Sequence, residues 1–137
     1  METTVPTPTS GETTLLYVDD DEDTRRMIGT ILHRRYKTVQ ILFAGDGIDA
    51  LLKVVERSPD IILLDIFLPC LDGFTLAKKI LTDNRESKVV VVSGCSDPVV
   101  VDGCLALGIA GYVSKPIYFP DFFQLLDELI GMEEVGP

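Results

Sequence analysis

Short apolar runs alternate along the chain with longer segments in which apolar residues recur at helical spacing. Continuous apolar runs of this length predict strands that are buried on both faces, and the spaced pattern predicts amphipathic helices. The expected strands are residues 15–18, 39–43, 61–64, 89–92 and 111–113, and the expected helices are residues 22–35, 46–57, 74–82, 98–107 and 120–130. Five successive β-α units indicate an α/β fold, with a parallel sheet between two layers of helices.

The two ends of the chain depart from this pattern. Residues 1–12 are rich in Thr, Pro, Ser and Gly, which predicts a disordered N-terminal tail. Residues 132–137 are expected to form a C-terminal tail, leaving one domain over residues 13–131. Every apolar run is far shorter than the ~20 residues needed to cross a bilayer, and the start of the chain lacks the pattern of a signal peptide. We therefore expect a cytoplasmic protein with no membrane segment.

The formal net charge of −10 limits the ligands that this domain can attract. Nucleic-acid backbones and anionic membrane surfaces both attract Lys and Arg, so direct binding of either is not expected, although a separate output domain could bind DNA. The three cysteines are odd in number and form no Cys-x-x-Cys pair, which argues against a disulfide framework or a zinc site.

Polar residues follow four of the expected strands directly. Asp19 and Asp20 follow the first strand, Asp65 the third, Ser93 the fourth and Lys115 the fifth. The carboxyl ends of parallel strands lie at one edge of the sheet, where open α/β sheets bind their ligands. The sequence therefore predicts one crevice that contains carboxylates, a hydroxyl and an ammonium group.

The carboxylates in this crevice need a compensating charge. Two carboxylates ~4 Å apart repel each other by roughly 4 kcal/mol at an effective dielectric constant of ~20. A hard divalent cation such as Mg²⁺ fits a set of oxygen ligands and leaves coordination positions for phosphate oxygens. An acidic turn that favours a helix N-terminus is the simpler interpretation of residues 21–23, but it does not explain Asp19 and Asp20, which end an apolar strand.

Asp65 has a simpler interpretation too, because a strand-end Asp is often a helix cap. The cap of the following helix is better assigned to Asp72, which leaves Asp65 free for chemistry. Lys115 precedes Pro116, so its backbone is extended and its side chain has a fixed direction; a peptide bond of this kind can also be cis. A cation, a nucleophilic carboxylate, a hydroxyl and an ammonium group together suit the handling of a phosphoryl group.

Four segments of the chain resemble the receiver domain of two-component response regulators. They are residues 15–25 (LLYVDDDEDTR), 60–74 (DIILLDIFLPCLDGF), 89–94 (VVVVSG) and 111–116 (GYVSKP). The resemblance covers roughly residues 13–131. It implies a CheY-like, flavodoxin-like sheet of five parallel strands in the order 2-1-3-4-5.

The resemblance also implies a role for each matching residue. Asp65 would be the phosphoacceptor, Asp20 the direct Mg²⁺ ligand, Asp19 the holder of metal-bound water, and the backbone carbonyl of Phe67 a further metal ligand. Ser93 would be the switch hydroxyl, Lys115 the partner of the phosphoryl oxygens, and Tyr112 the aromatic rotamer switch. Packing in the core is the alternative role for Tyr112.

The function implied is that of a signalling switch and not an enzyme. A histidine kinase or a phosphotransfer protein would donate the phosphoryl group from a phosphohistidine. Residues 117–123 are strongly apolar, which suits a homodimer or a protein partner on the face formed by the fourth helix, fifth strand and fifth helix. The alternative is that Tyr118 and Phe119 merely cover the loop.

Positions 67 and 95 depart from the commonest family pattern. Polar groups at these two positions favour dephosphorylation in the family, whereas this chain has Phe67 and Cys95. A bulky aromatic group and an uncharged one should exclude or fail to orient the hydrolytic water. We therefore expect slow hydrolysis of the phosphorylated form.

Two other functional classes remain open from the sequence. A phosphatase of the haloacid dehalogenase type would use an Asp-x-Asp motif, which Asp19 and Asp21 supply, but it gives Asp65 no role and expects Thr or Val where Asp23 stands. A flavodoxin-like electron carrier would need Ser, Thr and Gly in the first β-α turn, where this chain has carboxylates. A binding module without phosphoryl chemistry is a further alternative, although all five polar strand-end residues are present.

Overall fold

The computed structural model describes residues 13–83 and 86–131, so the two predicted tails lie outside the described residues. Its elements are β1 (Thr14–Val18), α1 (Glu22–Arg35), β2 (Gln40–Ala44), α2 (Gly47–Arg57), β3 (Ile61–Leu64), α3 (Gly73–Asp83), β4 (Lys88–Ser93), α4 (Pro98–Ala106), β5 (Gly111–Ser114) and α5 (Phe119–Ile130). The strands pair in parallel in the order β2-β1-β3-β4-β5, which confirms the predicted α/β fold and sheet order. None of the described helices is long and apolar enough to cross a membrane.

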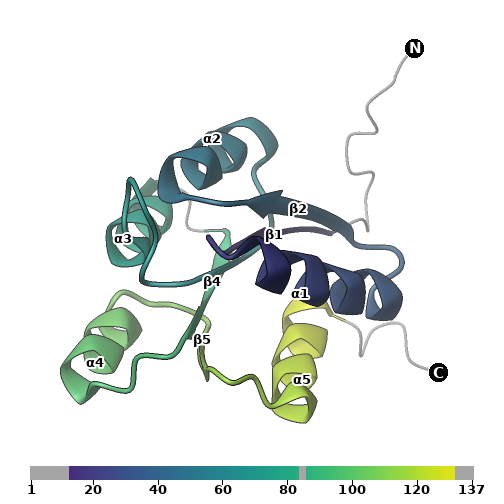
Figure 1. Ribbon diagram of the computed structural model, residues 1–137. Coiled ribbons are helices and arrows are strands. Elements are labelled where there is room, and N and C mark those ends of the chain that lie inside the picture. Colours follow the sequence, from purple (N-terminus) through teal and green to yellow (C-terminus); the bar gives the residue numbers. More distant parts are fainter. Residues whose placement is uncertain (1–12, 84–85, 132–137) are drawn as a thin grey trace.

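Two layers of helices cover the sheet (Figure 1). Helices α2, α3 and α4 lie on one face, and α1 and α5 lie on the other. Alternate residues of the central strands face opposite layers, so Leu16 and Val18 of β1 join the first core while Leu15 and Tyr17 join the second. The three inner strands are apolar along most of their length, and their polar side chains lie at the strand ends or, for Tyr17, one residue before an end.

The helix boundaries follow from their caps. Asp21 and Asp46 accept hydrogen bonds from the backbone N–H groups of the first turns of α1 and α2, and Asp72 does the same for α3 as predicted. Strand β2 begins one residue later than expected, because Gln40 pairs in register with Thr14 while the N–H of Val39 bonds to the carbonyl of Tyr36. Helix α5 begins at Phe119, since a proline is tolerated in a first helical turn.

A cluster of four side chains fastens α1 to α5 at the end remote from the strand ends that bear the carboxylates. Arg35 lies over the ring of Phe123, with its guanidinium carbon 4.3 Å from the ring centroid, and donates to Asp127 at 2.7 Å. The buried Tyr36 hydroxyl donates to the same carboxylate at 2.6 Å. Partial burial alone would raise the pKa of Asp127, but the bonds from Arg35 and Tyr36 outweigh it and lower the pKa.

Gly73 lets α3 approach the backbone of Asp65. A Cβ atom added at Gly73 would lie 1.9 Å from the carbonyl oxygen of Asp65, and the N–H of Gly73 donates to the carbonyl of Ile66 at 2.7 Å. The first turn of α3 therefore holds the loop that follows β3 in place.

We expect Gly73→Ala to lower the free energy of unfolding by about 1–3 kcal/mol, because the added methyl group must displace the Asp65 backbone. Gly94→Ala is the control, since a Cβ at this exposed glycine meets no atom within 4 Å. Chemical denaturation measures both variants. Equal stability of the two would contradict the close approach of α3 to Asp65.

Candidate phosphorylation site

The carboxylates of Asp19 and Asp65 meet at the ammonium group of Lys115. Asp19 follows β1, Asp65 follows β3 and Lys115 follows β5, so all three lie at the carboxyl edge of the sheet. The Lys115 Nζ donates to Asp19 Oδ2 at 3.0 Å and to Asp65 Oδ2 at 3.1 Å. The Lys115–Pro116 peptide bond is cis. The structure thus brings together three of the predicted site residues around one cation.

Asp19 and Asp65 stabilise the charged form of Lys115. Partial burial alone would lower the pKa of this ammonium group, but the hydrogen bonds to Asp19 and Asp65 outweigh burial and raise it above its ordinary value of 10.5. Because the folded-state pKa is raised, the bonds of the charged Lys115 to Asp19 and Asp65 contribute their full stability below about pH 10.5. That stability is lost as the pH rises through the folded-state pKa. Lys115 is therefore fully charged, and fully stabilising, at neutral pH.

Asp19 is buried and surrounded by donors. Its Oδ2 accepts from the Tyr17 hydroxyl at 2.9 Å as well as from Lys115, and its Oδ1 accepts from the backbone N–H of Asp21 at 3.0 Å. Arg25 donates to the Asp19 carbonyl at 2.6 Å, which fixes the backbone at the end of β1. Burial raises the pKa of the Tyr17 phenol, and the adjacent Asp19 raises it further, so Tyr17 stays a neutral donor.

Asp65 is held in one orientation but is less enclosed than Asp19. Its Oδ1 accepts from the backbone N–H of Phe67 at 3.2 Å, while Oδ2 accepts from Lys115. Its side chain is 13% exposed, against 3% for Asp19. Asp65 therefore remains accessible to an incoming group, as a phosphoacceptor must be.

The predicted Mg²⁺ site is compatible with these groups. Within residues 13–83 and 86–131 no three His, Cys, Asp or Glu side chains are grouped so that they could hold a metal ion. Mg²⁺, however, usually binds through one or two carboxylates and keeps several waters. Asp19 and Asp65 already share one cation, and the Asp20 side chain next to them is exposed to solvent. Hard oxygen donors at this edge of the sheet fit the ion.

Ser93 and Tyr112 are connected through the loop that follows β4. The fully buried Ser93 hydroxyl accepts from the N–H of Cys95 at 3.2 Å, and the Tyr112 hydroxyl donates to the Cys95 carbonyl at 2.6 Å. Burial raises the pKa of the Tyr112 phenol. Tyr112 is half-buried and packs beside the first core, which fits the packing alternative, while its role as a rotamer switch stays a prediction.

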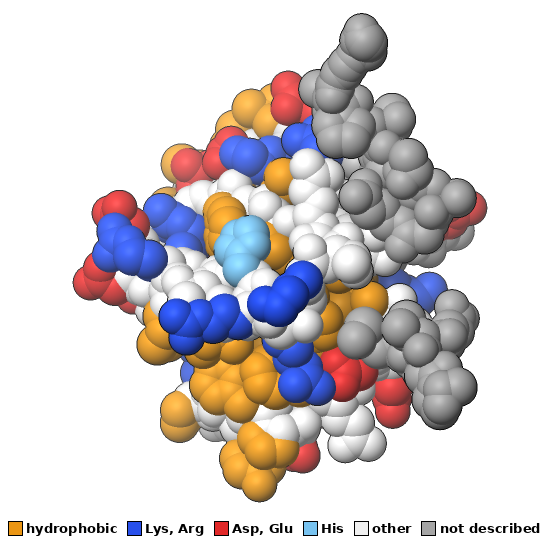
Figure 2. All heavy atoms as spheres, turned by 90° about the vertical axis from the view of Figure 1, so that its right-hand side faces the viewer, with side chains coloured by type: hydrophobic (Ala, Val, Ile, Leu, Met, Phe, Trp, Pro, Cys, Tyr) orange, Lys and Arg blue, Asp and Glu red, His pale blue; other side chains and the backbone are white. Residues whose placement is uncertain are grey.

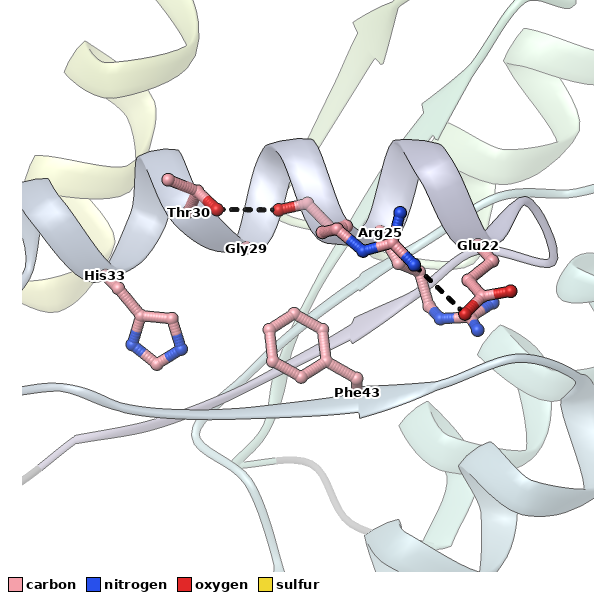
Figure 3. A pocket seen from close by; sticks show the side chains of 7 residues that line it. Glu22, Arg25, Gly29, Thr30, His33 and Phe43 are labelled. Atoms are coloured by element: carbon pink, nitrogen blue, oxygen red, sulfur yellow. Dashed lines mark hydrogen bonds and ion pairs between the residues drawn. The ribbon is translucent and has the colours of Figure 1, made fainter.

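A separate hollow of about 380 Å³ lies between α1 and β2. Figure 3 shows His33 of α1 next to Phe43 of β2 among the side chains that line it, and their ring centroids are 6.1 Å apart. Lys and Arg side chains gather around the histidine on this face (Figure 2). The predicted site residues do not line the hollow, but Arg25, which lines it, donates to the Asp19 carbonyl, so the hollow lies beside the carboxylate site. Arg26 on the same wall is paired with Glu22 and Asp23.

Sequence reasoning missed two residues that shape the site. The pattern of the first strand predicted only that Tyr17 is buried, yet its hydroxyl bonds to Asp19. The signal was present, because residues two apart on a strand share a face. Arg25 was treated as part of a matching segment, and only the structure shows that it bonds to the Asp19 carbonyl.

Comparison with known proteins decides the family. A family model described as the response regulator receiver domain matches residues 15–127. The chain belongs to the response regulator receiver family. Receiver domains of this family are signalling switches of two-component systems, in agreement with the interpretation of the strand ends.

Two curated relatives illustrate where such receivers occur. The chain is 35% identical over 106 residues to the chemotaxis protein CheY of Treponema pallidum, which covers 75% of this chain and 72% of that protein. It is 32% identical over 102 residues to protein-glutamate methylesterase/protein-glutamine glutaminase 3 of Geobacter sulfurreducens, which covers 74% of this chain. The match spans only 27% of that relative's length, so it concerns a receiver-sized part of a longer protein.

A solved structure also has the same fold. A chain of the CheX-CheY-BeF3-Mg²⁺ complex from Borrelia burgdorferi superposes with a TM-score of 0.78 and is 26% identical, covering 85% of this receiver and 88% of that chain. The overall fold of this chain is thus shared with that solved structure.

Proposed function

We propose that this receiver accepts a phosphoryl group on Asp65 from a phosphohistidine and passes the signal on through a change at Ser93 and Tyr112. The observation that carries the proposal is the shared ammonium group: Lys115 donates to both Asp19 and Asp65 at the strand ends. A solved relative named with BeF3 and Mg²⁺ supports the same chemistry.

Asp65 acts as the nucleophile in this proposal. A carboxylate oxygen of Asp65 forms the new bond to phosphorus while the bond from phosphorus to the donor imidazole nitrogen breaks, and the imidazole takes up a proton. The hydrogen bonds from Phe67 and Lys115 fix the plane of the carboxylate before the reaction. Preorganised donors of this kind provide most of the catalysis in phosphoryl transfer.

The metal would be held by Asp19, Asp20, Asp65 and the backbone carbonyl of Phe67. When bound, Mg²⁺ neutralises charge that develops on the phosphoryl oxygens. Lys115 supplies a second positive charge at the same place, because its ammonium group already contacts Asp65. Without these positive charges, the carboxylates at this edge of the sheet would repel the negatively charged phosphoryl group.

Phosphorylation would then act on the loop that follows β4. The new group adds a charge of about −1.5 to −2 and strong acceptor oxygens at the edge of the sheet where β4 ends with the buried Ser93. If Ser93 turns to the phosphoryl group, its bond with the Cys95 N–H is lost and the Cys95–Tyr112 contact is free to change. This links the charge on Asp65 to the orientation of an aromatic side chain on β5.

The experiment is incubation of the full chain with acetyl phosphate and Mg²⁺, followed by intact-mass measurement and release of inorganic phosphate. We expect one phosphoryl group per chain and no sustained turnover. Continuous turnover of a phosphate ester without a stable phosphoprotein would favour the phosphatase alternative. No uptake at all would refute the proposal.

The partners are part of the proposal. A histidine kinase or phosphotransfer protein would supply the phosphoryl group in the cytoplasm. The exposed apolar side chains of Val99 and Leu105 on α4 and of Tyr118 before α5 support the predicted homodimer or protein contact on the α4-β5-α5 face. Phe119, by contrast, is half-buried, with its ring centroid 6.0 Å from that of Phe122.

The phosphorylated form should be long-lived because of Phe67. This side chain is 64% exposed beside the phosphoacceptor, and it has no polar group to orient a water molecule. We expect Phe67→Asn to shorten the half-life of phosphorylated Asp65 by about 10-fold. This is less than the roughly 100- to 10,000-fold that a positioned group contributes to a proton transfer, because an amide only orients the water. Phe67→Leu is the matched control and should keep the slow rate. An Asn variant that loses phosphate no faster than the Leu variant would contradict this role of Phe67.

A further inference from the structure

The hydroxyl of Tyr17 reaches the phosphorylation site from inside the core. The ring is 1% exposed and packs in the core formed with α1 and α5, among residues that include Ile28 and Phe122. Tyr17 and Asp19 are two residues apart at the end of β1, so their side chains are directed to the same face. The hydroxyl donates to Asp19 Oδ2 at 2.9 Å.

This hydrogen bond belongs to a continuous chain. The Tyr17 hydroxyl and the Lys115 ammonium group both donate to Asp19 Oδ2, and the same ammonium group donates to Asp65 Oδ2. Three hydrogen bonds of 2.9–3.1 Å therefore connect a core aromatic residue to the phosphoacceptor. The apolar side chains of Leu15, Leu16 and Val18 in the same strand could not contribute such a link.

We propose that Tyr17 is a positioning residue that fixes the Asp19 carboxylate for Mg²⁺ and, through Asp19, keeps Lys115 directed at Asp65. This inference rests on the proposed function of the site. It adds a residue of the buried core to the metal-binding machinery, acting through Asp19 and not by contact with the metal or the phosphoryl group.

Loss of the Tyr17 hydroxyl has two opposite consequences for Mg²⁺. It removes a donor that competes with a cation for Asp19 Oδ2, which would strengthen binding. It also leaves a carboxylate that is only 3% exposed with one donor fewer, so that the carboxylate turns toward its remaining donors, Lys115 and the Asp21 N–H. The second effect should dominate, because a buried carboxylate strongly requires hydrogen bonds and outer-shell partners typically change metal affinity 10- to 100-fold.

The test compares Tyr17→Phe with Tyr36→Phe in the full chain. Both changes remove one hydroxyl that a fully buried tyrosine donates to a carboxylate, but Tyr36 bonds to Asp127 at the opposite end of α1. Titration with Mg²⁺ alone, followed by the backbone amide signals of Asp65 and Phe67 in NMR spectra, measures the affinity without any phosphodonor. We expect the dissociation constant to rise about 10-fold in Tyr17→Phe and to stay within about twofold of wild type in Tyr36→Phe.

The outcomes separate this inference from the proposed function. Unchanged affinity in Tyr17→Phe, or an equal loss in both variants, would overturn the positioning role. Wild-type protein that binds Mg²⁺ but takes up no phosphoryl group would refute the proposed function, while a selective loss in Tyr17→Phe would still support the role of Tyr17 in metal binding. Wild-type protein that binds no Mg²⁺ would overturn both.

A second measurement covers the case in which Tyr17→Phe does not fold. In wild-type protein labelled with 3-fluorotyrosine, Mg²⁺ should shift the ¹⁹F resonance of Tyr17 and leave that of Tyr36 in place. The Tyr17 signal is assigned by elimination, with Phe variants of the other three tyrosines. A Tyr17 resonance that does not respond to Mg²⁺ would overturn the inference.

Discussion

Asp65→Asn should take up no phosphoryl group from acetyl phosphate, a loss of at least about 1,000-fold in rate, because an amide oxygen is a poor nucleophile at phosphorus. The variant should remain folded, since its single amide oxygen can still accept from one of the two donors that hold Asp65, the Phe67 N–H or Lys115, and the change removes one of two neighbouring carboxylate charges. Phosphorylation is measured by intact mass in the presence of Mg²⁺.

Asp49→Asn is the matched control for this change. Asp49 is a half-exposed carboxylate of α2 whose side chain pairs with Lys53 on the same helix. Its variant should be phosphorylated at the wild-type rate. Wild-type uptake by Asp65→Asn would show that another residue is the acceptor, and a loss of uptake in both variants would show a general effect of charge.

Replacing Lys115 by Met should destabilise the folded protein at neutral pH, by about 1–3 kcal/mol, because Asp19 and Asp65 then face each other without a cation. Mg²⁺ should restore much of this loss, since a bound cation takes over the neutralisation and ligand binding stabilises the folded state by mass action. The increase in unfolding temperature on adding Mg²⁺ should therefore be larger for the variant than for wild type. Phosphoryl uptake should still fall, because the charge that Lys115 supplies to the phosphoryl oxygens is lost.

Lys79→Met is the control for this prediction. Lys79 pairs with Asp83 one helical turn away, with both side chains more than half exposed, and such a pair is worth about 0–1 kcal/mol. The destabilisation by Lys115→Met should also shrink as the pH rises above about 10.5 and the wild-type ammonium group loses its proton. If Mg²⁺ stabilised Lys115→Met no more than wild type, the two carboxylates would not form a cation site.

The arrangement of the sheet was predictable because hydrophobic burial determines it. The inner strands are apolar on both faces, so any polar residue at their ends marks the ligand edge, and Asp19, Asp65 and Lys115 were identified on that basis. The starts of α1 to α4 depended on capping Asp side chains, and the sequence places Asp72 as a cap correctly. The start of β2 shifted by one residue from the prediction, because the pairing of Gln40 with Thr14 overrode the apolar pattern.

The contacts between the site residues were not predictable in the same way. Lys115 contacts both Asp19 and Asp65 because the crossover connections bring the ends of β1, β3 and β5 together, and side-chain distances of this kind follow from three-dimensional packing. The bond between Tyr112 and the Cys95 carbonyl likewise depends on the path of a loop. Tyr17 is an intermediate case, since strand alternation predicts the shared face but not that the hydroxyl reaches the carboxylate.

Chemical mapping of the phosphorylated residue tests the assignment of Asp65 most directly. Reduction of the phosphoprotein with borohydride converts an aspartyl phosphate into homoserine, which peptide mass spectrometry locates in the sequence. We predict homoserine at position 65 alone, and none in the Asp65→Asn variant. Homoserine at position 19 would instead support the phosphatase alternative, and phosphate that resists reduction at Ser93 would contradict the receiver mechanism proposed for this chain.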